Sequence, residues 1–156
     1  MDTIVVCTRF NYTTWEENKR WRENKKYNGC IYCTPKNIAK SIPIGSILIV
    51  IEMQNSNNTI LGLGIIKNLL KHKHFKIYSD LNYNRFSYFS PYRIDKKEFT
   101  PEEEILIKKI EIILFKGSGH LKRGDGITQV PQKHVCKLEL ISKLKKMFTN
   151  RFTNPP

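Results

Sequence analysis

The sequence has no long hydrophobic run, and none of its apolar stretches approaches the roughly 18–20 residues that a membrane-spanning helix requires. Its first residues, MDTIVVCTRF, also lack the basic stretch followed by a long apolar stretch that is typical of a secretory signal. We therefore expect an intracellular protein, in the cytoplasm or the nucleus, without a membrane partner. The length of 156 residues predicts a single domain over residues 1–150 and a frayed C-terminal tail over residues 151–156.

Cysteines are few, 4 at irregular spacing, which indicates thiols rather than a disulfide framework. Cys30 and Cys33, in the stretch YNGCIYCTP, are spaced like metal ligands or a redox pair. A structural zinc site needs four converging ligands, and His134 with Cys136 offers a second pair. Residues three apart on a strand point to opposite faces. We therefore interpret Cys30 and Cys33 as buried, reduced, metal-free strand residues, with a zinc module or a redox pair as alternatives.

Acidic residues are scarce as well, with 14 Asp and Glu against 27 Lys and Arg, for a net charge of +13 and a pI near 9.7. A surplus of this size in one domain attracts polyanions, of which nucleic acid is the commonest. A compositional bias toward lysine, asparagine and isoleucine explains part of the count, but not why arginines stand beside aromatic residues and glycines. We predict a nucleic-acid partner, with RNA and DNA as alternatives.

Motifs of catalysis are largely missing. The phosphate-binding loop of nucleotide hydrolases, the dinucleotide-binding fingerprint and a pair of carboxylates at metal-binding spacing are all absent from the sequence. The compact mixed set of polar side chains that remains consists of Asp125 with His120 and Lys122. We therefore expect a binding protein without a cofactor rather than an enzyme, and this set leaves catalysis as the alternative.

Local patterns predict an α+β fold, a curved or barrel-like mixed sheet with flanking helices. Apolar β-branched runs predict strands, and Thr100, Pro101 and Gly117 mark the ends of a helix. The expected elements, in order, are a strand (3–10), a helix capped by Thr14 (13–26), a short strand (29–35), a short helix (36–42), two strands (42–53 and 59–70), an irregular hairpin (74–99), a helix (100–117) and a last strand or helix (133–148). Gly62 and Gly64 share one face of their strand, where we expect a close neighbour.

Aromatic and basic side chains alternate around the first predicted helix. An unstacked base gains ~1–3 kcal/mol from an aromatic face, arginines hold phosphates, and an asparagine reads a base edge. On this basis we predict base contacts from Trp15, Trp21, Tyr32 and Asn11, and phosphate contacts from Arg9, Arg20 and Arg22. The alternative is that these aromatic residues belong to the core.

The stretch FKGSGHLKRGDGI holds half of the 8 glycines of the chain. Glycines let the backbone approach a ligand closely, and successive N–H groups can form an anion-binding concavity. Lys116, Lys122 and Arg123 add side-chain donors. We predict a phosphate-contacting loop, with a flexible connector as the alternative.

Residues 3–68 combine several of these patterns. The stretch YNGCIYCTPKNIAKSIPIGSILIVIEMQNSNNTILGLGIIKN runs from a short strand, which ends in an aromatic residue, a small residue and threonine, to two apolar strands of which the second carries G-x-G. This order resembles the PUA-like superfamily, in particular its YTH and EVE branches. The resemblance implies a small β-barrel that binds nucleic acid and often seats a flipped, sometimes modified, base in an aromatic pocket.

The same resemblance assigns two residues. Tyr32 stands where YTH domains place a cage tryptophan, and Thr34 stands where a polar residue contacts the base. The resemblance also implies an alternative function, because relatives of the ASCH branch include hydrolases and nucleases that act on RNA or on modified nucleosides.

Overall fold

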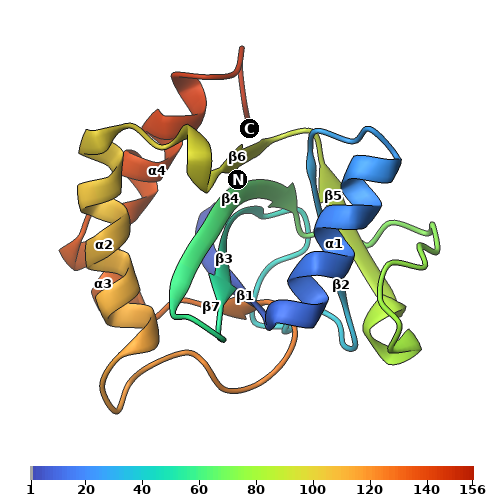
Figure 1. The fold of residues 1–156 in the computed structure, drawn as a ribbon. Helices are drawn as coiled ribbons and strands as arrows, with labels where there is room; N and C mark the ends of the chain where they lie inside the picture. Colours follow the sequence, from blue (N-terminus) through green and yellow to red (C-terminus); the bar gives the residue numbers. More distant parts are fainter. Residues whose placement is uncertain (1) are drawn as a thin grey trace.

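The computed structural model describes residues 2–156, which form two β-sheets with flanking helices (Figure 1). The strands are β1 (Thr3–Phe10), β2 (Cys30–Thr34), β3 (Ile47–Gln54), β4 (Thr59–Lys67), β5 (Phe86–Ser90), β6 (Arg93–Asp95) and β7 (Thr128–Gln129). The helices are α1 (Tyr12–Asn24), α2 (Pro101–Phe115), α3 (Gln132–Lys137), α4 (Leu140–Thr149) and the short 3-10 helices η1 (Leu81–Asn84) and η2 (Lys96–Glu98). The α+β class is therefore confirmed. Within residues 2–156, no helix has both the length and the apolar character needed to cross a membrane.

The larger sheet has five strands in the order β6-β4-β3-β1-β7, and the smaller sheet pairs β2 with β5. β1 runs parallel to β3, and the other pairs are antiparallel. Within residues 2–156, no strand pairs with the edge of β2 that faces away from β5, and β7 pairs with β1 only at Val6 and Cys7. The sheet is not closed, because the edge of β2 and the part of the β1 edge beyond Cys7 stay unpaired in the described part of the chain. The expectation of a barrel-like sheet is therefore corrected.

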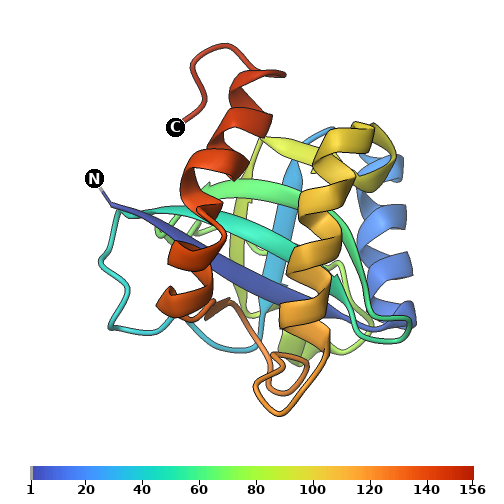
Figure 2. The ribbon, with the colours of Figure 1, turned by 90° about the vertical axis from the view of Figure 1, so that its left-hand side faces the viewer.

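The larger sheet is buried on both faces, which is why β3 and β4 read as almost continuous apolar runs. Ile49 and Ile51 belong to the core cluster that includes α2 and α4, and both helices lie on one side of the sheet (Figures 1 and 2). Leu48 and Val50, which alternate with them, belong to the cluster that includes β2 and β5. Alternate residues of one strand thus supply two cores, and the second core supports the site described below.

Three expected elements differ in the structure. Residues 36–42 form bends and turns rather than a short helix. Residues 133–148 form α3 and α4, which are separated at Glu139 by a left-handed backbone conformation (φ 51°). Residues 74–99 do not form a hairpin, because β5 pairs with β2 whereas β6 pairs with β4. Pro91 lies between β5 and β6 and has no N–H to continue a ladder, so the chain passes there from one sheet to the other.

The helix starts are partly as predicted. Thr100 and Glu103 form the expected capping box of α2. The cap of α1, however, is Asn11 rather than Thr14: Asn11 Oδ1 accepts a hydrogen bond from the Thr14 N–H (2.8 Å), and Thr14 Oγ1 accepts one from the Asn11 N–H (3.0 Å). Asparagine caps a helix at least as well as threonine, so the helix begins directly after β1.

The C-terminal segment is anchored in part. Arg151 donates hydrogen bonds to both carboxylate oxygens of Glu103 (2.8 and 2.5 Å). The ring of Phe152 stacks on that of Phe148 with a centroid distance of 6.0 Å. Arg151 and Phe152, the first two residues of the predicted tail, thus each have a defined partner in the fold.

Candidate functional site

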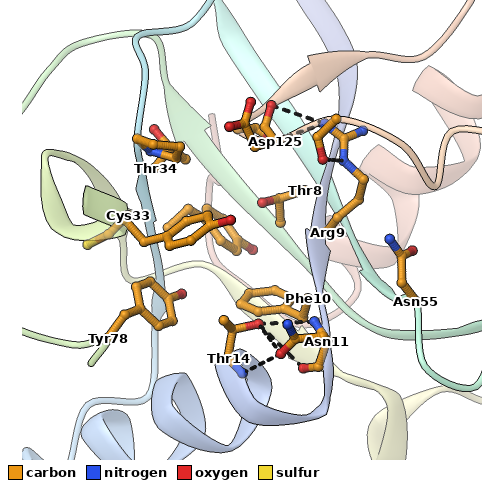
Figure 3. Close-up of a pocket in the computed structure, with 15 residues that line it drawn as sticks. Thr8, Arg9, Phe10, Asn11, Thr14, Cys33, Thr34, Asn55, Tyr78 and Asp125 are labelled. Atoms are coloured by element: carbon orange, nitrogen blue, oxygen red, sulfur yellow. Dashed lines mark hydrogen bonds between the residues drawn. The ribbon is translucent and has the colours of Figure 1, made fainter. Parts of the chain in front are cut away.

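A cavity, here called the strand-end pocket, lies where β1 and β2 end (Figure 3). It is lined by Thr8, Arg9, Phe10, Asn11, Thr14, Tyr32, Cys33, Thr34, Pro35, Asn55, Tyr78, Tyr83, Gly124, Asp125 and Gly126. Its volume is about 160 Å³. Because an apolar cavity of about 150 Å³ holds a benzene ring, the strand-end pocket has room for one planar ring.

Two unpaired strand edges border the strand-end pocket. The Phe10 carbonyl accepts a hydrogen bond (2.8 Å) on the β3 side, so the N–H and C=O of Arg9 face the opposite side. The Ile31 carbonyl accepts a hydrogen bond from Asn18 Nδ2 (2.9 Å) on the side away from β5, and Cys33, two residues later, faces that same side. Within residues 2–156, these main-chain groups of Arg9 and Cys33 have no hydrogen-bond partner. The pocket is therefore bordered by free main-chain donors and acceptors.

Aromatic rings form the apolar walls of the strand-end pocket. Phe10, Tyr32 and Tyr78 are buried, whereas Tyr83 is half exposed. The rings of Tyr78 and Tyr83 meet edge-on with a centroid distance of 6.3 Å. Thr8, with 6% of its surface exposed, points between these walls (Figure 3), and its hydroxyl has no hydrogen-bond partner within residues 2–156. The pocket thus combines flat apolar faces with a free hydroxyl.

Arg9, which we predicted to hold a phosphate, instead ties the glycine-rich loop to β1. Its five N–H groups donate to the carbonyl oxygens of Gly124 (3.1 Å), Leu121 (3.1 Å), Asp125 (3.2 Å) and Gly126 (3.3 Å) and to the hydroxyl of Thr128 (2.9 Å). Gly124 and Gly126 have positive φ angles of 94° and 78°, which allow their carbonyls to turn toward one guanidinium. Since no donor of Arg9 remains, the predicted phosphate contact is corrected to a clamp on the loop.

This clamp leads to a first prediction. Replacing Arg9 with methionine should release residues 121–126, because four hydrogen bonds to the loop and one to Thr128 of β7 are lost while the apolar stem is kept. Amide hydrogen exchange in the loop should become roughly tenfold faster or more, with β3 unchanged. The control Lys36→Met removes only the exposed ion pair with Asp125 (2.7 Å) and should have little effect. Unchanged loop exchange in the Arg9 variant would contradict the clamp.

Tyr32 separates the strand-end pocket from a buried charge cluster. Its hydroxyl donates to Glu52 Oε2 (2.7 Å), and Arg93 donates to both oxygens of Glu52 (3.0 and 2.7 Å) and to Asp95 Oδ1 (3.0 Å). Burial, followed by the negative charge of Glu52, raises the pKa of Tyr32 well above its usual range, so the phenol stays a neutral donor. A Cβ at Gly64 would overlap with the Tyr32 hydroxyl. The close neighbour expected at Gly64 is therefore confirmed.

The structure brings four of the predicted site residues to the strand-end pocket: Arg9, Asn11, Tyr32 and Thr34. The Thr34 hydroxyl donates to the Lys36 carbonyl (2.7 Å). The two tryptophans do not line the pocket. Trp15 lies edge-on to Phe10 (5.4 Å) and Trp21 lies edge-on to Phe75 (5.4 Å), so both pack beside the second core.

The residues predicted to hold phosphate are dispersed. Arg22 lies over the Trp15 ring at 5.2 Å and donates to Asn18 Oδ1 (2.8 Å), and burial lowers the pKa of Arg22. Arg20 and Lys116 are exposed, on α1 and just after α2 respectively. Half-exposed Lys122 and exposed Arg123 directly precede Gly124 and therefore stand beside the strand-end pocket.

The cysteines are placed as interpreted from the sequence. Cys30 and Cys33 are buried in β2, and each thiol lies beside a serine hydroxyl of β5 (3.5 and 3.3 Å). Burial raises the pKa of both thiols to about 11, so both are neutral near pH 7. His134 and Cys136 lie in the helix α3 and not on a strand. In the part of the chain that the structure describes, no three His, Cys, Asp or Glu side chains are grouped to hold a metal ion.

The polar set that left catalysis as an alternative consists of Asp125, His120 and Lys122, and its members make contacts within the fold. The hydrogen bond from Lys36 lowers the pKa of Asp125, and the two side chains form an ion pair (2.7 Å). His120 Nδ1 accepts a hydrogen bond from the Lys122 N–H (3.2 Å). Within residues 2–156, no hydrogen bond joins His120 to Asp125, so these side chains do not form an acid–base pair.

Sequence patterns did not reveal Thr8, Asn55, Tyr78 or Tyr83. Asn55 belongs to the turn between β3 and β4, and its Nδ2 holds the glycine-rich loop at the Lys122 carbonyl (2.7 Å). The two tyrosines come from the aromatic-rich stretch 74–99, where only the density of aromatic residues could have indicated a site.

No protein-family model, curated protein or solved structure matches the chain. Features that bear on function are therefore the strand-end pocket and the charge of the chain. The pocket offers flat walls, main-chain donors and acceptors, and a hydroxyl. Such a set suits reversible binding of a polar planar ring.

Proposed function

We propose that the protein binds nucleic acid and seats one base, flipped or unpaired and with or without a modification, in the strand-end pocket. The observation that carries this proposal is the pair of free strand edges that face each other across a ring-sized space. A base has two flat faces and an edge of hydrogen-bond donors and acceptors. The rings of Tyr78 and Tyr83 are nearly perpendicular, so this pair offers a stacking surface for one face of the base, and the main chain at Arg9 and Cys33 matches the edge.

The charge supports the same proposal. The net charge of +13 creates a field that attracts a phosphate backbone and holds it independently of sequence. Lys122 and Arg123 stand next to the loop that borders the strand-end pocket. We extend the proposal to the fold family, a PUA-like domain of the YTH and EVE type, on the basis of the sequence resemblance of residues 3–68, whose two assigned residues, Tyr32 and Thr34, line the strand-end pocket.

Filling the strand-end pocket tests this function. Thr8→Phe places a ring in the space proposed for the base, so affinity for a labelled nonamer, single-stranded DNA or RNA, should fall about tenfold or more in fluorescence anisotropy. The dependence of log Kd on log salt should keep its slope, because no phosphate contact changes.

The matched control is Thr13→Phe, which adds the same ring at an exposed position of α1 that does not line the pocket, and it should bind like the wild type. Circular dichroism checks that both variants are folded. The proposal is wrong if the wild type fails to bind either nonamer at about 50 mM salt, where phosphate contacts are strong. It is equally wrong if the two phenylalanine variants bind alike.

A further inference from the structure

Two more hollows lie beyond the segment that carries Tyr78 and Tyr83 of the strand-end pocket. Tyr83, at the rim of the pocket, belongs to η1, and the first hollow begins at the neighbouring residues of η1 and ends at Phe75 and Lys76. The second hollow shares Phe75 and Lys76 with the first and extends to Trp21 and Lys25. Their volumes are about 550 and 540 Å³. The two hollows therefore form one path, which begins beside Tyr83 at the rim of the pocket.

Aromatic and cationic side chains alternate along this path, here called the basic track and defined by Arg85, Phe86, Phe75, Lys76, Trp21 and Lys25. The Arg85 guanidinium lies 5.4 Å from the centre of the Phe86 ring. Phe75 stands edge-on to Trp21 (5.4 Å). The three aromatic residues are half exposed and the three cations are exposed. Each of the two hollows therefore combines partly exposed rings with exposed cations.

The basic track is held in a fixed position relative to the strand-end pocket. Asn84 accepts hydrogen bonds from the N–H groups of Ile77 and Tyr78 (3.1 and 3.0 Å) and donates one to the Tyr78 carbonyl (2.8 Å). The Glu17 carboxylate of α1 accepts a hydrogen bond from the Ser79 N–H (2.7 Å). The segment that carries Phe75 and Lys76 thus also carries Tyr78 of the pocket wall, so a ligand on the track lies in register with the pocket.

We propose that the basic track binds the nucleotides that flank the seated base, and that its ligand is a single strand. This inference rests on the proposed function and adds the form of the nucleic acid and its path. Aromatic faces stack on bases only when these are unpaired, whereas lysine and arginine hold the phosphates between them. On the other rim of the pocket, Lys36 is engaged by Asp125 and the Arg9 guanidinium by the loop, which leaves Lys122 and Arg123 as cations there. The track, by contrast, combines three exposed cations with three partly exposed rings.

The test removes three charges from the track and three from elsewhere. The track variant is Lys25→Gln with Lys76→Gln and Arg85→Gln. The control variant is Lys109→Gln with Lys143→Gln and Lys146→Gln, exposed residues of α2 and α4, which lie apart from α1 and β5 in Figure 1. Both variants have the same net charge. Labelled oligothymidine of 12 and 4 nucleotides and a mixed-sequence 12-base-pair DNA duplex are the probes.

We expect the track variant to bind the 12-mer at least tenfold more weakly than the control variant. The slope of log Kd against log salt should fall by about 2, since each lost phosphate contact on a single strand accounts for roughly 0.7. The tetramer is too short to reach from the pocket along the track. Its affinities for the two variants should therefore differ much less. Wild-type protein should prefer the 12-mer single strand to the duplex.

The outcomes separate the inference from the proposed function. One outcome is that the wild type binds the single strand, Thr8→Phe lowers that affinity, and the two triple variants bind equally well. The proposal of the basic track is then wrong, and the proposal of a base in the strand-end pocket stands. A wild-type preference for the duplex likewise overturns the track, because paired bases cannot stack on its rings. If the wild type binds neither the single strands nor the duplex, the proposed function and the basic track are both overturned.

Discussion

Replacing Arg93 with methionine is expected to remove a large part of the stability of the fold, with a loss of about 3–5 kcal/mol. The side chains of Arg93 and Glu52 are only 5% and 2% exposed, and they are joined by two hydrogen bonds (3.0 and 2.7 Å). Without the guanidinium, the Glu52 carboxylate keeps the Tyr32 hydroxyl but loses its counter-charge in a buried site. Since small domains are stable by only ~5–15 kcal/mol, urea denaturation should show a large drop of the midpoint.

Two comparisons make this expectation specific to the buried pair. Lys36→Met breaks an ion pair of similar length (2.7 Å) whose side chains are 61% and 46% exposed, so it should cost less than about 1 kcal/mol. The double variant Arg93→Met with Glu52→Met removes both charges, and it should recover part of the loss because no unpaired charge stays buried. A double variant no more stable than Arg93→Met, or a single variant as stable as Lys36→Met, would contradict this account.

The same cluster shows why a count of charges is an incomplete guide to a binding surface. The net charge of +13 suggests a polyanion as partner, but it does not say which arginines are free to meet it. Arg9 is used by the loop, Arg22 by Trp15 and Asn18, and Arg93 by Glu52 and Asp95. Two of these had been predicted as phosphate ligands. Only tertiary contacts distinguish such internal arginines from exposed ones like Arg85.

Local sequence predicted those parts of the fold whose causes are local. β1, β3 and β4 follow from runs of apolar and β-branched residues, and α2 follows from its capping box and Pro101. The partners of β5 and β6 were not predictable in this way, because the chain changes sheets at Pro91. Closure of the sheet is also a non-local property, decided by which edges meet.

The candidate site divides in the same manner. Tyr32 and Thr34 were predicted through the family resemblance of residues 3–68, and both line the strand-end pocket. Thr8, Tyr78 and Tyr83 line the same pocket but come from segments far apart in sequence, which only the packing of β1, β2 and η1 brings together. Trp15 and Trp21 were predicted from their chemistry, yet neither lines the pocket: both pack partly on the second core, and Trp21 lines the basic track instead.

The last expectation concerns Gly64, because the sequence predicted a close neighbour on the strand face that Gly64 shares with Gly62. A methyl group at Gly64 would overlap with the Tyr32 hydroxyl and lie 2.9 Å from Cys30 Sγ. Neither neighbour can withdraw easily, because Tyr32 is a rigid buried ring held by Glu52 (2.7 Å) and Cys30 is fully buried. Gly64→Ala should therefore cost about 1–3 kcal/mol in urea denaturation. Gly119→Ala, where no atom lies within 4 Å of the added methyl, should be nearly neutral.

A double-mutant cycle then identifies the cause of the loss. Tyr32→Phe removes the atom that the new methyl group meets, at the cost of leaving Glu52 with one donor fewer. If overlap with the hydroxyl is what destabilises Gly64→Ala, the same substitution should cost at least about 1 kcal/mol less in the Tyr32→Phe background. Equal costs in both backgrounds would show that the strain arises elsewhere on β4. A displaced Tyr32 should also narrow the strand-end pocket, because that ring forms one of its walls, so Gly64→Ala should weaken binding of the labelled nonamer whereas Gly119→Ala should not.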